Sequence, residues 1–175
     1  MNAPAVASPY LASVALLGVA GLAKVARPKS TVLALRQAGF PATRTAVRGG
    51  AVAETAVAVA SLVAPGAVTG ALVAGCYSAF TAFTVVALRM RWPISSCGCF
   101  GKPDTLPTKA HAFLNAGAVV SAVWWAVGRP ANVDRVFSGQ PWHGAPLGLT
   151  TAVVALLAYI VWTNPVPSVS GGEGP

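Results

Sequence analysis

The feature that most constrains this chain is a series of five long apolar stretches with very few charged residues. A helix that spans the hydrocarbon core of a bilayer needs about 20 consecutive, mostly apolar residues. Four stretches have that length, and the second is short unless it begins nearer Val47 or includes part of Pro65-Gly66. We therefore predict an all-α membrane protein, a bundle of about five transmembrane helices. The stretches are Ser8–Ala26, Ala51–Val63, Ala67–Met90, Ala110–Val127 and Ala145–Thr163.

Composition argues against a soluble globular domain, because hydrophobic residues make up 55% of the chain and charged residues only 9%. A soluble domain is about one quarter charged. The net charge of +8 would suggest nucleic acid as the partner of a soluble protein, but here the basic residues lie between apolar stretches. No basic segment is interleaved with aromatic residues in the way that nucleic-acid binding needs. We expect a lipid bilayer, and no nucleic acid, around this protein.

The distribution of basic residues predicts how the helices cross the membrane, because cytoplasmic connections are enriched in Lys and Arg. The first and third connections are rich in these residues, the second has none, and the fourth has Arg129 and Arg135. This alternation favours a multi-pass plasma-membrane protein with its N-terminus outside and its C-terminus in the cytoplasm. Residues 1–9 contain no Lys or Arg, so the first stretch is expected to be a retained anchor rather than a signal peptide. The basic residues of the two rich connections are Arg27, Lys29, Arg36, Arg44 and Arg48, then Arg89, Arg91, Lys102 and Lys109.

The strongest local signal is a Cys-Gly-Cys-Phe-Gly sequence at residues 97–101 of the third connection. Two cysteines one residue apart can form a small, strained disulfide, and Gly98 has no Cβ to obstruct it. Strained disulfides are more oxidising and are more often catalytic or labile than structural. Lys102 would favour the reactive thiolate. We interpret Cys97 and Cys99 as a catalytic redox pair.

Other interpretations of the cysteines remain open. Cys97 and Cys99 would also suit zinc or copper(I), with His111 as the nearest third ligand, or they are simply two unrelated thiols in a loop. A lone histidine at a helix start is more often a hydrogen-bonded residue than a metal ligand. Cys76, inside the third stretch, is expected to behave as a small hydrophobic residue rather than as a resolving thiol.

Four further polar residues are expected to support the cysteines. An intramembrane carboxylate is costly and generally has a partner or a function, and Lys24 is the obvious partner of Glu54. The alternative for Lys24 is that its side chain extends to the membrane interface. His111 and Asn115 are four residues apart, so they lie on one face of the fourth helix. With Cys97 and Cys99, these residues come from four segments yet fall at one depth. Such convergence predicts a site better than any single motif does.

These residues together resemble the MauE group of DoxX-like membrane proteins. The resemblance rests on Ala-Gly-Leu-Ala-Lys at residues 20–24, Glu54 in the next helix, the Cys-Gly-Cys-Phe-Gly sequence, and Asn115 in the helix after it. It covers about residues 8–128 and implies a redox-associated protein that acts beside a thioredoxin-like partner. In methylamine-utilisation systems, such proteins assist maturation of the disulfide-rich methylamine dehydrogenase. We expect no bound cofactor.

The resemblance divides the chain into three parts. Residues 1–128 are predicted to form a four-helix MauE/DoxX-like core, and residues 129–163 an extracytoplasmic connection and a fifth transmembrane helix. Residues 164–175 are rich in Pro, Gly and Ser and are predicted to form a disordered cytoplasmic tail.

Two functional hypotheses follow. The first is a thiol–disulfide relay in which Cys97 and Cys99 cycle between dithiol and disulfide. The second is a non-catalytic membrane assembly factor or metal-binding subunit. The first meets a difficulty, because disulfides form outside the cytoplasm whereas the charge distribution puts the cysteines inside. Either the pair relays electrons across the membrane, or its connection dips into the bundle, or the orientation is inverted.

Overall fold

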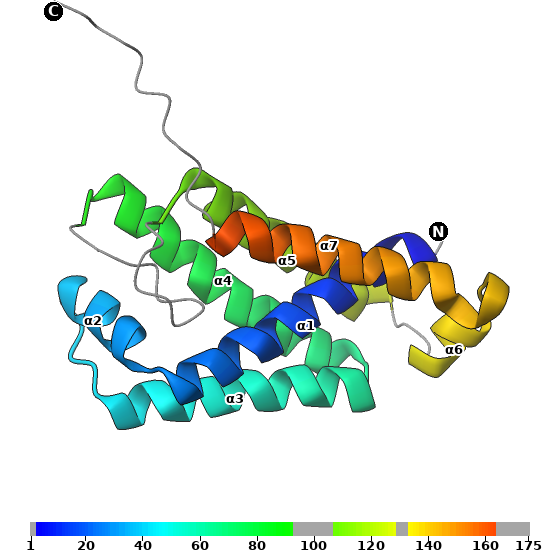
Figure 1. Ribbon diagram of the computed structural model, residues 1–175, viewed down its shortest axis with the longest axis horizontal. Helices are drawn as coiled ribbons and strands as arrows, with labels where there is room; N and C mark the ends of the chain where they lie inside the picture. Colours follow the sequence, from blue (N-terminus) through cyan, green and yellow to red (C-terminus); the bar gives the residue numbers. More distant parts are fainter. Residues whose placement is uncertain (1–2, 93–106, 129–132, 164–175) are drawn as a thin grey trace, which may run out of the picture.

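The computed structural model describes residues 3–92, 107–128 and 133–163, and these residues form a bundle of helices (Figure 1). Five helices are long and apolar enough to cross a membrane, which confirms the predicted all-α architecture. No strand occurs within the described residues. Cys97 and Cys99 lie outside the described residues, as does the tail from residue 164. The five helices are α1 (Ala3–Ala26), α3 (Arg44–Val63), α4 (Ala67–Arg89), α5 (Lys109–Gly128) and α7 (Ala145–Thr163).

The second spanning helix is longer than its apolar stretch. It begins at Arg44 rather than at Ala51, and its 20 residues are enough to cross a bilayer. Thr43 precedes it in an extended conformation, and the Thr43 side chain accepts a hydrogen bond from the Ala46 backbone N–H at 3.1 Å. This N-cap satisfies one of the amide groups that the first turn leaves without a partner. Because the first turns of α3 are polar, a search for apolar residues alone places the start of this helix too late.

A short helix that the sequence did not predict, α2 (Lys29–Gln37), lies across one end of the bundle (Figure 1). Its face toward the bundle buries Val32 and Ala34, while Arg36 is exposed. The helix ends at Gln37, and Gly39 just beyond it has a φ of 85°, the left-handed conformation that glycine adopts without strain. Two further short elements, α6 (Val133–Ser138) and a 3₁₀ turn η1 (Pro141–Gly144), precede α7.

Helix α1 is the centre of the bundle and packs against α3, α5 and α7, while α4 packs mainly against α5. Close approach depends on small residues. A Cβ atom added at Gly21 of α1 would lie 2.9 Å from the Ala51 carbonyl oxygen of α3, and one added at Gly70 of α4 would lie 3.1 Å from the Cβ of Ala126 of α5. Small residues let helices approach in lipid, where burial of apolar area does not drive their association.

The outer surface of the bundle is apolar. Large hydrophobic side chains are exposed along every spanning helix, and α7 is the least buried of the five. Exposed apolar area on this scale would be costly in water but is normal where lipid tails surround a helix. Examples are Val52 and Val59 on α3, Val68 and Leu72 on α4, Val120 and Val123 on α5, and Leu149, Val153, Leu156 and Ile160 on α7.

Candidate functional site

The candidate site is built around an ion pair between α1 and α3. Lys24 Nζ lies 2.6 Å from Glu54 Oε2, which is the pairing that the sequence predicted. The Lys24 side chain is 6% exposed and that of Glu54 is 16% exposed. Each residue is the only charged residue in its apolar stretch, so each neutralises a charge that would otherwise be stranded in a low dielectric.

Helix α4 contributes an aromatic ring to the same pair. The Lys24 ammonium lies 4.5 Å from the centroid of the Phe80 ring, within the range of a cation–π interaction. Phe80 in turn packs edge-on against Tyr77, whose hydroxyl donates a hydrogen bond of 2.7 Å to the Ser13 carbonyl of α1. The ion pair is therefore held from three helices.

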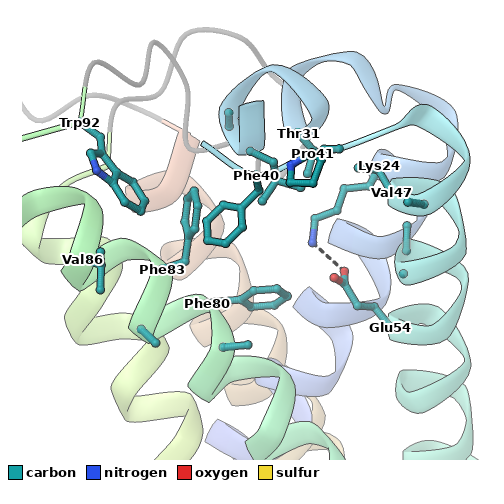
Figure 2. A pocket seen from close by; sticks show the side chains of 18 residues that line it. Lys24, Thr31, Phe40, Pro41, Val47, Glu54, Phe80, Phe83, Val86 and Trp92 are labelled. Atoms are coloured by element: carbon teal, nitrogen blue, oxygen red, sulfur yellow. Dashed lines mark hydrogen bonds and ion pairs between the residues drawn. The ribbon is translucent and has the colours of Figure 1, made fainter. Parts of the chain in front are cut away.

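A cavity of about 700 Å³ opens above the ion pair, between α1, α2, α3 and α4 (Figure 2). Protein interiors are close-packed, with few voids larger than one water molecule, so a space of this size is not a packing defect. It falls within the usual range for small-molecule sites. The residues around it are Lys24, Thr31, Ala34, Leu35, Phe40, Pro41, Ala42, Ala46, Val47, Gly50, Ala51, Glu54, Ala79, Phe80, Ala82, Phe83, Val86 and Trp92.

Small side chains on two helices create the cavity. Ala46 and Gly50 on α3 face a wall of α4 that contains Ala79 and Ala82. A Cβ added at Gly50 would meet nothing within 4 Å. All four of these residues are exposed, so the space between α3 and α4 opens at the side of the bundle. Because both helices are spanning segments, this side faces lipid.

Two helix ends turn aromatic residues into the opposite part of the cavity. Phe40 follows Gly39 and donates its backbone N–H to the Leu35 carbonyl at 2.9 Å, the bond that closes a Schellman cap of α2. Trp92 repeats this arrangement at the end of α4, where it follows a left-handed residue and donates to the Ala87 carbonyl at 3.1 Å. The ring centroids of Phe40 and Trp92 lie 6.4 Å apart, and those of Phe83 and Trp92 lie 6.0 Å apart (Figure 2).

His111 makes contacts elsewhere in the bundle. The Thr108 hydroxyl and backbone N–H lie 2.6 and 3.2 Å from its Nδ1, and its Nε2 lies 3.3 Å from the Trp162 carbonyl oxygen. Because Nδ1 is an acceptor, Nε2 carries the proton and donates a hydrogen bond to the Trp162 carbonyl oxygen. His111 thus caps the start of α5 and joins it to the end of α7. Neither His111 nor Asn115, which is also buried, lines the cavity.

The structure describes Cys76 but not the other two cysteines. Cys97 and Cys99 are outside the described residues, so the structure does not place them relative to the ion pair. Cys76 lies on α4, one turn before Phe80, and is half-buried against the core of the bundle.

The arrangement defines a class of protein: a multi-pass helical membrane protein with a buried ion pair beneath an aromatic, lipid-facing cavity. A family model described as methylamine utilisation protein MauE matches residues 1–128. The chain belongs to this family, as its sequence resemblance predicted. The matched residues end with α5. Comparisons with curated proteins and with solved structures found no match.

Proposed function

We propose that this protein is a membrane thiol–disulfide redox protein that assists disulfide formation in partner proteins. Cys97 and Cys99 form its redox pair, and a thioredoxin-like protein is its partner. Membership of the methylamine utilisation protein MauE family supports a role in maturation of an enzyme such as methylamine dehydrogenase. The Cys-Gly-Cys sequence is the part of the chain whose chemistry suits that role.

The observation that supports this proposal is that the cavity wall includes Trp92, from which the chain continues to Cys97 and Cys99. Trp92, in the cavity wall, precedes Cys97 by five residues, a length of chain that reaches at most about 18 Å. The end of α4 and the start of α5, which this connection joins, lie at the same end of the bundle as α2 (Figure 1). A connection of this length allows the thiols to reach the cavity, which supports the proposal.

The reaction is an exchange between two thiols and one disulfide. A thiolate of the partner attacks one sulfur of the Cys97–Cys99 disulfide, which gives a mixed disulfide and releases the other sulfur as a thiolate. The second partner thiol then displaces the bound cysteine. The partner gains a disulfide, and Cys97 and Cys99 gain the electron pair and become a dithiol.

The metal-binding alternative has less support. His111, the third ligand of that alternative, has a hydrogen-bond partner at each ring nitrogen. A metal at Nδ1 would have to displace Thr108, and a metal at Nε2 would have to break the hydrogen bond that joins α5 to α7.

Alkylation tests the redox pair directly. Trypsin does not cleave before proline, so Cys97 and Cys99 fall together in one peptide, 92–109, and Cys76 falls in another. After mild reduction, we expect two labels on peptide 92–109 by mass spectrometry and none on the same peptide of the oxidised protein. Cys76 labelling should not depend on the reductant, because its thiol is half-buried in an apolar helix.

Substitution tests whether the pair is needed for function. Cys97→Ser and Cys99→Ser should each abolish disulfide formation in the partner while the protein remains folded in the membrane. Cys76→Ser is the matched control and should remain active. Full activity of both Ser variants at residues 97 and 99 would disprove the redox role and leave the assembly-factor hypothesis.

A further inference from the structure

We propose that the cavity above the Lys24–Glu54 ion pair binds a lipid-soluble quinone. This inference deepens the proposed function and rests on it for the class of ligand, but the evidence for a binding site comes from the described residues alone. A planar ring with a carbonyl group suits the polar group and the aromatic side chains of the cavity, and a lipid-soluble molecule can enter it from the bilayer.

The ion pair supplies the polar recognition. An ammonium group has three N–H donors. In the structure, Glu54 Oε2 accepts from Lys24 Nζ, and the Phe80 ring faces the same nitrogen without accepting a conventional hydrogen bond. Within the part of the chain that the structure describes, Lys24 therefore has a donor available to a carbonyl oxygen in the cavity. Ligand sites of this size are typically apolar with a few such polar groups that fix orientation.

The aromatic residues favour a planar ligand. Phe40, Phe83 and Trp92 lie around the cavity on the side away from Glu54, and the Phe80 ring lies beneath them, next to Lys24 (Figure 2). Aromatic rings prefer offset-stacked or edge-to-face contacts with other rings, which are worth about 0.5–1.5 kcal/mol beyond burial. An acyl chain of a lipid would fill the space without using this geometry or the Lys24 donor.

Because the cavity opens toward the bilayer, we expect its ligand to be lipid-soluble. The cavity opens between the exposed small residues of α3 and α4, on the lipid-facing side of two spanning helices. A ligand with an isoprenoid or alkyl tail can place its ring inside and leave its tail among lipid chains. A water-soluble ligand would have to cross this apolar surface.

The proposed redox function limits the ligand further. When the partner gains a disulfide, Cys97 and Cys99 hold two additional electrons and two protons as a dithiol. Re-oxidation of the dithiol to a disulfide must give both electrons and both protons to an acceptor. A quinone accepts two electrons and two protons and becomes a quinol, so the step balances with no other reactant.

Two adjacent glycines provide a matched test. Gly50 lines the cavity and Gly49 does not, yet a Cβ added at either would meet nothing within 4 Å. Both are in α3, so Gly49→Leu and Gly50→Leu should change helix propensity equally. Only Gly50→Leu puts a bulky side chain at the cavity.

The probe is decylubiquinone, whose fully substituted ring does not add thiols. Protein in phosphatidylcholine nanodiscs should show saturable quenching of tryptophan fluorescence, and Trp92→Phe should remove most of the saturable part. Gly50→Leu should weaken binding about tenfold or more, whereas Gly49→Leu should bind as the native protein does. Quenching that is linear, or equally affected in the two leucine variants, would overturn the proposal.

Two further arms separate the alternatives. Native mass spectrometry in nanodiscs that contain phosphatidylglycerol would reveal a lipid headgroup in the cavity, and lipid retention lost only in Gly50→Leu with no effect of quinone would overturn the proposal. Binding is expected to persist when Cys97 and Cys99 are both changed to Ser. Persistent binding with fully active cysteine variants would disprove the thiol-redox function and leave the quinone site standing.

Discussion

Glu54→Gln is the substitution whose cost can be worked out most directly from the structure. It leaves the Lys24 ammonium, which is 5% exposed, without its counter-ion in a spanning helix. Removing one partner of a buried ion pair typically costs about 3–5 kcal/mol. The Gln oxygen can still accept one hydrogen bond from Lys24, which is worth about 1 kcal/mol. We therefore expect the free energy of unfolding to fall by about 2–4 kcal/mol.

Thermal unfolding of the detergent-solubilised protein measures this loss. For a chain of this size, 1 kcal/mol corresponds to about 2–4 °C, so the melting temperature of Glu54→Gln should fall by roughly 5–15 °C. Lys29→Met removes an exposed charge at the start of α2 and should change the melting temperature little. It is the control for a general effect of charge.

A double-mutant cycle decides whether the loss belongs to the pair. Lys24→Met alone strands the carboxylate, while Lys24→Met with Glu54→Gln leaves no charge at all and should recover much of the stability. The exchanged variant, Lys24→Glu with Glu54→Lys, should also recover part of it. If the two single losses simply add in the double variant and the exchange recovers nothing, the two residues are not coupled and the reasoning is wrong.

Two more predictions concern packing and orientation. Gly21→Ala should destabilise the protein by about 1–3 kcal/mol in the same assay, because its Cβ would lie 2.9 Å from a carbonyl oxygen of α3. Gly75→Ala, with nothing within 4 Å of its Cβ, should be neutral or slightly stabilising, and equal effects would contradict the packing argument. A membrane-impermeant thiol reagent should leave Cys97 and Cys99 unlabelled in intact cells, because the basic connections are expected to be cytoplasmic. Strong labelling would invert the orientation.

The number and class of the spanning helices follow from the sequence. Hydropathy is a local property, since each spanning helix satisfies its own backbone and must be apolar over its own length. The pairing of Lys24 with Glu54 was one of two alternatives that the residues left open, because a lysine near the end of a span can also extend its side chain to the interface. Neither inference needed any knowledge of how the helices pack.

The structure added helix α2, moved the start of α3 and changed the role of one candidate residue. The first connection contains α2, and the second span begins at Arg44, because capping and burial of a few side chains outweigh a polar sequence at the end of the bundle. His111 was grouped with the ion pair from its depth alone, yet it binds Thr108 and Trp162. Depth in the membrane follows from the sequence, whereas the direction in which a helix face points does not.

The existence of the cavity follows from helix packing and not from any local sequence pattern. Gly50, Ala79 and Ala82 read in the sequence as ordinary small residues of spanning helices, of the kind that elsewhere let helices touch. Gly70 does bring α4 against α5, whereas Gly50 faces open space. The difference depends on the divergence of α3 and α4 and on the capped ends that place Phe40 and Trp92 over the gap. These are relations between distant segments, which no local pattern of residues records.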